Sequence, residues 1–389
     1  MTPCTLVVEP QQQSRLDHID GIRACAALVV YLNHAYAQVS TGDVVQLHGP
    51  MALSRFSMVA GHLSVTVFIV VSGFCLTLPV IRNGGEVRGG TAEFLKRRAR
   101  RILPPYYAAL ALCLLLIWTV IGKPTGSLWD FPIGVTTEAV VSHLLLLQDL
   151  FATSRINYVF WSIAVEWQIY FVVPLLVLAW RRYGAAWVVP TALLLGYALR
   201  IGLSATRVTR AHPQFLGMFA LGMLAAHLAR SMDPGFVRAR ARTPWALIAG
   251  LLFVTIIAVT YAWGVRLSED RFFMLDLPVG LLAMSTLAAT SSAKPSGLVK
   301  VFAWRPLVFV GTFSYSLYLI HAPLLQILWQ YVLVPLHVSR EAMLIYLLTL
   351  GLGATLVASY GFFRLFEAPF MKPARAKPAT QSEAVPPPR

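Results

Sequence analysis

The sequence predicts an all-α integral membrane protein with about ten transmembrane helices, because apolar runs of about 20 residues recur along the chain. Hydrophobic residues make up 57% of the 389 residues, charged residues make up only 13%, and the mean hydropathy is +0.66. These proportions exclude an ordinary water-soluble globular domain. The net charge of +15 would suit nucleic acid, but the basic residues lie in short links between apolar runs rather than on one face. We therefore expect no nucleic-acid partner.

About ten runs are long enough to cross a bilayer if each forms a helix. They cover residues 21–39, 62–81, 103–122, 161–180, 186–203, 213–230, 244–264, 274–291, 308–334 and 341–366. The shorter apolar stretch near 138–150 cannot span a bilayer, and we interpret it as interfacial or re-entrant. Lys and Arg are concentrated in alternate links, above all between Arg82 and Arg101. This bias predicts that both termini are cytoplasmic.

A single membrane domain, residues 16–371, is expected between two polar ends. Residues 1–15 are expected to form a short N-terminal cytoplasmic segment. Residues 372–389 are rich in Pro and Ala, and we expect them to form a disordered cytoplasmic tail. The first apolar run is too long for the apolar part of a signal peptide, so we expect it to remain as the first span.

Two polar side chains in the first apolar run, Arg23 and His34, are the first indication of a functional site. A charge in hydrocarbon costs at least ~2.5 kcal/mol, so such residues normally face a cavity or a partner. A spacing of eleven residues returns both to one helical face, with a rise of roughly 16 Å, which suggests one site. His34 is then either a general base or a helix-packing histidine. Arg23 is either an anion ligand at the cytoplasmic mouth or a side chain that snorkels to headgroups.

A basic segment, FLKRRARRILPPYY at residues 94–107, follows the second run. Arg98 and Arg101 lie one helical turn apart if the segment is helical, and guanidinium groups bind phosphate in bidentate fashion. The sharper interpretation is a site for a phosphorylated cytosolic ligand. The alternative is a topology anchor that binds anionic membrane lipids.

Two later runs also contain polar groups. Ser162 and Glu166 are spaced i, i+4, so they share one helical face. Glu166 is an acid in an apolar run and is expected to face the protein interior, as a catalytic group or as the structural partner of an arginine. His321 lies within the ninth run, as a second polar site or as one member of a helix–helix hydrogen bond, which we prefer.

The second run contains Ser72, Gly73 and Phe74, which indicate a point of close packing or bending between helices. The remaining histidines show no metal-like spacing such as HExxH, and the four cysteines show none either. We therefore expect no metal.

Taken together, these residues resemble the membrane acyltransferase-3 family, the bacterial integral-membrane O-acyltransferases that modify surface polysaccharides, lipopolysaccharide and some small molecules. The resemblance runs from about Leu16 to Pro369, and its motifs occur in the family's order. The residues that match are Arg23 and His34 in DGIRACAALVVYLNH, Phe68, Ser72, Gly73 and Phe74 in FIVVSGF, Arg98 and Arg101 in RRARRILPPYY, Ser162 and Glu166 in WSIAVEWQIY, and His321 in SYSLYLIHAP.

The chain departs from the family pattern at two positions. Trp167 stands where many relatives carry a second acid, and Ile69 stands where relatives often have a second phenylalanine. Some relatives append an extracytoplasmic hydrolase-like domain, and this chain resembles the stand-alone form. It is expected to act alone or with a separate periplasmic transferase partner.

The resemblance implies an enzyme of the bacterial cytoplasmic (inner) membrane with acyl-CoA, expected to be acetyl-CoA, as a cytoplasmic donor co-substrate and with no permanently bound cofactor. It implies that Arg23, Arg98 and Arg101 hold the nucleotide phosphates. His34 then deprotonates the acceptor hydroxyl or is itself transiently acylated. Glu166 orients His34, pairs with its charge or positions the acceptor. The expected acceptor is a surface or lipid-linked glycan such as an O-antigen or exopolysaccharide.

Other interpretations remain open at this point. A secondary transporter or lipid-linked glycan exporter would use the same buried polar groups as a substrate path. Within the family, the acceptor could instead be a small secreted metabolite such as a macrolide. The residues Ser72, Gly73, Phe74, Ser162 and His321 are assigned to a substrate-binding or structural site.

Overall fold

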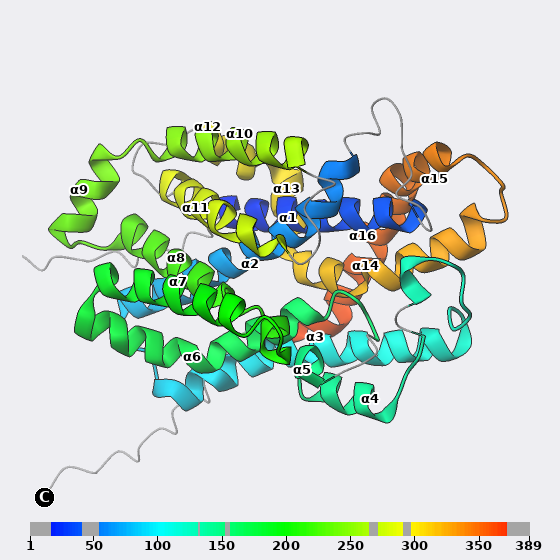
Figure 1. The fold of residues 1–389 in the computed structure, drawn as a ribbon, viewed down its shortest axis with the longest axis horizontal. Helices are drawn as coiled ribbons and strands as arrows, with labels where there is room; N and C mark the ends of the chain where they lie inside the picture. Colours follow the sequence, from blue (N-terminus) through cyan, green and yellow to red (C-terminus); the bar gives the residue numbers. More distant parts are fainter. Residues whose placement is uncertain are drawn as a thin grey trace, which may run out of the picture.

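The computed structural model describes residues 17–40, 54–130, 133–151, 156–263, 271–290 and 297–371 (Figure 1). The expected N-terminal segment 1–15 and the expected tail 372–389 lie outside these residues. The described part is helical and contains no strand. Its α-helices are α1 (Asp17–Val39), α2 (Ser54–Arg82), α3 (Gly90–Thr119), α4 (Thr137–Leu144), α5 (Gln148–Phe151), α6 (Trp161–Tyr183), α7 (Ala185–Gly202), α8 (Phe215–Arg230), α9 (Pro234–Arg242), α10 (Trp245–Trp263), α11 (Phe273–Thr290), α12 (Gly297–Phe302), α13 (Arg305–Thr312), α14 (Ser314–Leu328), α15 (Arg340–Tyr346), α16 (Leu352–Phe362) and α17 (Ala368–Met371).

Five shorter elements complete the described structure. Two are 3₁₀ turns, and three are π-helical segments that continue α14, α15 and α16. They are η2 (Leu128–Asp130), η3 (Arg207–Ala211), η5 (Trp329–Leu333), η6 (Leu347–Gly351) and η7 (Phe363–Glu367).

The described helices confirm an all-α, multi-pass membrane protein. Eight of them are long and apolar enough to cross a membrane, and the count reaches nine if the segment Arg207–Arg230 and α9, which are bent by 89°, form one span. α1 has 23 residues and lies in the interior of the bundle against α2, α13 and α14 (Figure 1). Its small and apolar side chains are buried there, including Ala24, Val30 and Ala35. α1 is therefore the central helix, covered by the others.

The outer surface of the bundle is apolar. Trp187 and Leu194 on α7, Leu251 on α10 and Val357 on α16 are all exposed. Large exposed apolar side chains on several helices are unfavourable in water and match the hydrocarbon chains of a bilayer.

The stretch near 138–150 forms α4 and α5, which have 8 and 4 residues and are too short to cross a bilayer. Val141, Leu144 and Leu145 are exposed, whereas His143 and Gln148 are buried against the rest of the protein. This segment therefore has an apolar side that faces outward and a polar side that faces the protein, as an interfacial segment requires.

The ninth apolar run, expected as one helix over 308–334, is divided in two. Phe313 has φ −123° and ψ 20°, outside the helical region, and it separates α13 from α14. Gly311, just before this break, packs so closely on the backbone of Asp20 in α1 that a Cβ atom would overlap it. The break is therefore set by packing on the central helix, which the apolar pattern does not encode.

The crossing of α2 and α8 explains the glycine of the SGF sequence. A Cβ atom on Gly73 would overlap the carbonyl oxygen of Phe219, and one on Gly222 would overlap the carbonyl oxygen of Val70. Two backbones can approach this closely only where both helices lack side chains. Gly73 is therefore a helix-packing residue, and Phe74 beside it is fully buried in the core.

We expect Gly73→Ala to destabilise the protein, because the added methyl group must separate α2 from α8. Overpacking of this kind costs about 1–3 kcal/mol. Gly250→Ala on α10 is the matched control, since nothing lies within 4 Å of a Cβ atom there, and this change should be neutral or stabilising by about 0.5–1 kcal/mol. Thermal unfolding of the two detergent-solubilised variants measures the difference, and equal melting temperatures would contradict the crossing.

Candidate functional site

The central helix carries its two polar residues to two different cavities. Arg23 lines a cavity of about 770 Å³ together with Arg98 and Arg101, termed here the arginine cavity. His34 lines a second cavity of about 850 Å³, together with His62 and other polar residues, termed here the histidine cavity. Eleven residues bring both side chains to one face of the helix, and the rise of roughly 16 Å between them places them in different cavities. The expectation of a single shared site is therefore corrected to two cavities along one helix.

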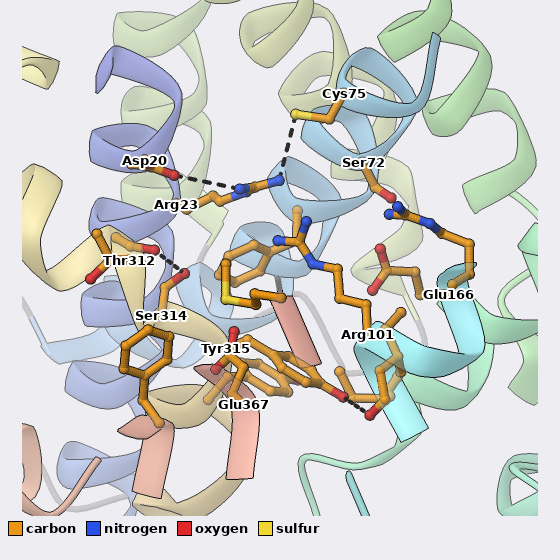
Figure 2. Close-up of a pocket in the computed structure, with 18 of the residues that line it drawn as sticks. Asp20, Arg23, Ser72, Cys75, Arg101, Glu166, Thr312, Ser314, Tyr315 and Glu367 are labelled. Atoms are coloured by element: carbon orange, nitrogen blue, oxygen red, sulfur yellow. Dashed lines mark hydrogen bonds and ion pairs between the residues drawn. The ribbon is translucent and has the colours of Figure 1, made fainter. Parts of the chain in front are cut away.

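The arginine cavity collects sequence motifs that are far apart along the chain (Figure 2). It is lined from α1, α2, α3, α6, α13, α14, α16, η7 and α17. The expected site residues that line it are Arg23, Ser72, Arg98, Arg101, Ser162 and Glu166. Gly73 and Phe74 are not among its lining residues, because Gly73 faces α8 and Phe74 is buried in the core. The structure thus gathers most of the acyltransferase-like motifs around one cavity.

The guanidinium groups of this cavity retain donors for a ligand. Arg23 Nη1 lies 3.5 Å from Asp20 Oδ1, and Arg23 Nη2 lies 3.5 Å from Cys75 Sγ. Arg98 Nε is buried without a hydrogen-bond partner among the described residues. A buried guanidinium nitrogen without an acceptor is costly. An anion in the cavity would satisfy it.

Three carboxylates line the arginine cavity, Asp20, Glu166 and Glu367, and hydroxyl groups donate to the last two. Tyr170 OH donates a 2.5 Å hydrogen bond to Glu166 Oε1, and Ser72 Oγ lies 3.3 Å from the same hydroxyl. Ser316 Oγ donates a 2.5 Å hydrogen bond to Glu367 Oε2, and Glu367 is only 3% exposed. These hydroxyl groups donate to Glu166 and Glu367, so the arginines are not needed to satisfy every acceptor position on these two acids.

His34 forms its hydrogen bond with another histidine. Its Nδ1 lies 2.8 Å from Nε2 of His321 on α14, and the two rings are stacked with centroids 5.0 Å apart. His321 thus forms a helix–helix hydrogen bond, as the sequence suggests, and its partner is His34. Glu166 lies in the arginine cavity instead, with Tyr170 as its hydrogen-bond donor. The structure therefore does not use Glu166 to orient His34.

The protons of this histidine pair can be assigned from their acceptors. His321 Nδ1 lies 3.0 Å from the carbonyl oxygen of Leu317 and 2.9 Å from that of Tyr318. Carbonyl oxygens only accept, so this nitrogen carries the hydrogen and Nε2 of the neutral ring is an acceptor. His34 must then donate from Nδ1. The lone pair of a neutral His34 consequently lies on Nε2, as a general base requires.

The histidine cavity brings together three further histidines that the sequence did not single out: His62, His143 and His212. They come from α2, α4 and the turn before α8, so no short spacing links them. Burial lowers the pKa of His143 to about 4, and this imidazole is neutral near pH 7. Arg200 and Arg210 also line the cavity. The imidazole and guanidinium groups give this cavity hydrogen-bonding capacity, and aromatic side chains line it as well.

Val65 and Tyr318 line both cavities and form the partition between them. Tyr318 OH donates to the carbonyl oxygen of Val159 (3.0 Å) and lies 2.6 Å from Ser162 Oγ. Ser162 thus fixes the partition. On α2 the arginine cavity extends from Val65 toward the C-terminal end, and the histidine cavity lies on the N-terminal side of Val65. The two cavities therefore occupy opposite halves of the bundle.

Several functional candidates escaped the sequence analysis. Glu367 and Tyr170 contribute to the arginine cavity, and Tyr318 contributes to the partition. Asp276 lies inside the run 274–291, where an acid in an apolar stretch is the same signal that singled out Glu166. That signal would have found Asp276.

The chain is similar to known O-acetyltransferases. Residues 16–364 match the family described as an acyltransferase domain. The chain is 22% identical over 333 residues to O-acetyltransferase OatA of Staphylococcus aureus (strain NCTC 8325 / PS 47), covering 80% of this chain and 50% of that protein. It is 23% identical over 389 residues to peptidoglycan O-acetyltransferase OatA of Listeria monocytogenes serovar 1/2a, covering 91% of this chain and 55% of that protein. The chain thus spans about half the length of these relatives, and no solved structure matches it.

We expect the two cavities to open to opposite sides of the membrane, because they occupy opposite halves of α1 and α2. Cys75 lines the arginine cavity and Ser204 lines the histidine cavity. A small, membrane-impermeant methanethiosulfonate should modify Cys75 from the cytoplasmic side and a Ser204→Cys variant from the other side. The background carries Cys4→Ser, Cys25→Ser and Cys113→Ser, and the Ser204→Cys variant also lacks Cys75. Modification of both positions from one side of sealed vesicles would contradict the arrangement.

Proposed function

Because this chain belongs to the acyltransferase family that it matches over residues 16–364, we propose that it acetylates a hydroxyl group of a bacterial surface glycan, with acetyl-CoA as donor co-substrate. Family membership and the apolar helices make it a membrane-bound O-acyltransferase. The finer proposal is carried by one observation: an arginine-lined cavity and a histidine-lined cavity meet at Val65 and Tyr318. We place the enzyme in the bacterial cytoplasmic membrane.

The arginine cavity supports binding of the donor. Coenzyme A carries a diphosphate and a ribose phosphate, and guanidinium groups bind such anions through paired, charge-assisted hydrogen bonds. Arg98 has a buried nitrogen in need of an acceptor, and Arg23 and Arg101 lie in the same cavity. The cavity volume of about 770 Å³ falls in the range typical of ligand sites. In this proposal the pantetheine arm extends from the phosphates to the partition.

His34 supports the chemical step as the general base. Its Nε2 takes the proton of the acceptor hydroxyl, and the hydroxyl oxygen attacks the thioester carbonyl carbon. The carbon–sulfur bond then breaks, and the coenzyme A thiolate leaves with a proton returned from His34. The products are an acetyl ester of the acceptor and free coenzyme A. His321 keeps His34 in the tautomer that the first proton transfer requires.

The acceptor enters through the histidine cavity in this scheme. The relatives are named O-acetyltransferases, one of them a peptidoglycan O-acetyltransferase, and their names support a glycan. Glu166 has a different role from His34: it fixes Tyr170 and Ser72 beside the donor. Direct transfer to the glycan is the proposed route. Transfer through a separate extracytoplasmic transferase partner is the alternative.

We expect His34→Ala to lower acceptor-dependent release of coenzyme A by about 10²–10⁴-fold, the usual contribution of a general base. His321→Ala should lower it as well, because His34 loses the acceptor that fixes its tautomer. The measurement is free thiol released from acetyl-CoA by purified protein in nanodiscs, with and without a glycan fraction. His337→Ala, at an exposed histidine, is the control. Full turnover by a folded His34→Ala protein would refute the role of His34.

We expect the double change Arg98→Gln and Arg101→Gln to raise the KM for acetyl-CoA by about 10–100-fold, because hydrogen bonds to charged groups contribute about 1.5–3 kcal/mol. The matched control is Arg100→Gln, which removes a neighbouring but exposed charge that does not line the cavity. Steady-state kinetics with acetyl-CoA as the varied substrate separates the two. An equal KM in both variants would mean that the arginine cavity does not hold the phosphates.

A further inference from the structure

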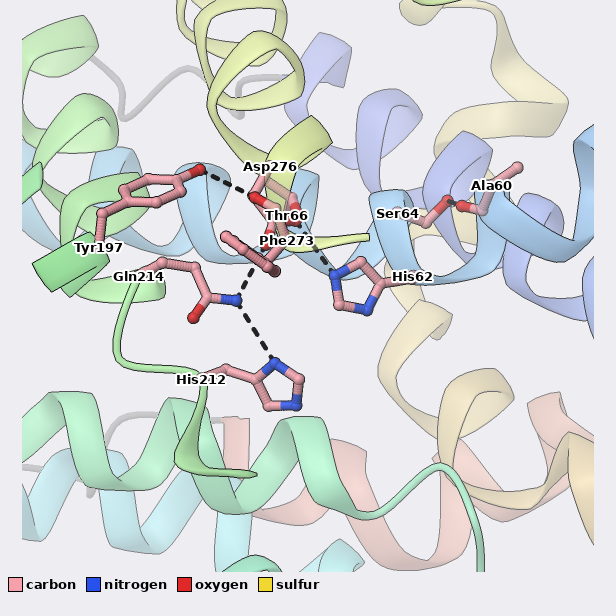
Figure 3. Close-up of polar contacts among 9 residues, drawn as sticks. All are labelled: Ala60, His62, Ser64, Thr66, Tyr197, His212, Gln214, Phe273 and Asp276. Atoms are coloured by element: carbon pink, nitrogen blue, oxygen red, sulfur yellow. Dashed lines mark hydrogen bonds and ion pairs between the residues drawn. The ribbon is translucent and has the colours of Figure 1, made fainter. Parts of the chain in front are cut away.

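A buried carboxylate, Asp276 on α11, is the centre of a polar cluster that the proposed chemistry does not use (Figure 3). Thr66 Oγ1 donates to it over 2.6 Å, and Gln214 Nε2 donates over 3.0 Å. His62 Nε2 lies 3.2 Å from Asp276 Oδ1. The cluster therefore joins α2, the N-cap residue of α8 and α11 at the edge of the histidine cavity.

A carboxylate at this buried position is costly for the fold, because it loses its hydration. Hydrogen bonds from Thr66 and Gln214 offset that loss. Among the described residues, no group of three His, Cys, Asp or Glu side chains is placed to bind a metal ion. The contact of Asp276 with His62, which lines the histidine cavity, points instead to a role in that cavity.

His62 is the member of the cluster that reaches the cavity. Asp276 has no exposed side-chain surface, whereas the His62 side chain keeps 14% of its surface and lines the cavity that contains His34. Gly61 packs so closely on Asn33 that a Cβ atom would overlap its side chain. α1 and α2 therefore touch one residue before His34 and His62. The two imidazoles belong to adjacent helices at this contact.

The ring of His62 is held on two sides. Asp276 lies at its Nε2 edge, and the indole of Trp161 stacks on its face, with centroids 5.8 Å apart and an angle of 11° between the planes. The contact does not meet hydrogen-bond geometry, but the negative charge of a carboxylate 3.2 Å from Nε2 favours the neutral tautomer that carries its hydrogen on that nitrogen. Nδ1 is then the acceptor nitrogen, and a hydroxyl group of a ligand can donate to it.

The walls of the histidine cavity suit a hydroxyl-rich ligand. Aromatic rings line it at Trp161, Phe272 and Phe273, and amide groups line it at Asn157 and Gln148. A molecule that carries both C–H faces and hydroxyl groups can pack on apolar ring surfaces. A few polar groups in the site then orient it. Sugars have this character.

We propose that the histidine cavity binds a saccharide and that His62, held by Asp276, is a positioning residue that accepts a hydrogen bond from one sugar hydroxyl and directs a neighbouring hydroxyl toward His34. This inference rests on the proposed function, because it concerns the acceptor of the same transfer reaction. It adds the residue pair, His62 and Asp276, that orients this acceptor.

The test uses the difference between the two ring nitrogens. Glutamine can place its amide nitrogen near the position of Nε2 and keep the contact with Asp276, but it has no atom in the position of Nδ1. A purely structural role therefore predicts that His62→Gln behaves as the wild type. Our proposal predicts a KM for the saccharide raised at least tenfold, with the KM for acetyl-CoA changed less than twofold. Asp276→Asn should shift the same KM, because the ring loses its fixed tautomer.

The assay measures coenzyme A released from acetyl-CoA by full-length protein in nanodiscs, with three probes as acceptors: the tetramer of N-acetylglucosamine, maltotetraose and an alginate tetramer. The control is His337→Gln, an exposed histidine that lines neither cavity, and it should keep both KM values. A selective rise in the saccharide KM for His62→Gln supports the proposal.

Three results would overturn it in distinguishable ways. A wild-type saccharide KM in folded His62→Gln, or an equal rise in both KM values, would end the positioning role. Hydrolysis of acetyl-CoA by the wild type without transfer to any of the three saccharides would end the saccharide assignment and leave the donor chemistry standing. No release of coenzyme A from any folded wild-type sample would contradict the proposed function itself.

Discussion

The structure depends on one constraint: polar side chains inside an apolar bundle must face a cavity or a hydrogen-bond partner. α1 is covered by other helices, so Arg23 and His34 cannot reach lipid headgroups and must be accommodated in the interior. The neighbouring helices provide this accommodation with two cavities and with His321. The outer helices present apolar side chains to the lipid, and none of these polar groups faces it.

Most of the fold could be predicted because the length and hydropathy of a spanning helix leave a direct record in the sequence. Most of the expected runs coincide with a described helix, the ninth run being the exception, and the stretch near 138–150 is non-spanning in both. The break at Phe313 and the π-helical segment η7 could not be predicted, because both arise where helices pack. Gly311 against α1 sets the first of these, and hydropathy contains no information about that contact.

The candidate site was predictable to the extent that single residues were chemically out of place. Arg23 and Glu166 are costly in an apolar run, and that cost identifies them without any knowledge of the fold. Distances between helices are a different kind of information. Periodicity put Arg23 and His34 on one face, but Tyr318 from α14 and Val65 from α2 divide that face between two cavities. The pairing of His34 with His321 likewise needed the tertiary structure.

The partition at Val65 and Tyr318 also has an electrical consequence. Polar cavities of this size hold water when no ligand fills them. The insulating layer between two such cavities is then a single layer of side chains instead of roughly 30 Å of hydrocarbon. A membrane voltage falls mainly across the low-dielectric part of its path, and moving one charge through it is worth about 2.3 kcal/mol per 100 mV. This thin layer must therefore block ion leakage, and protons that move beside it experience most of the membrane field.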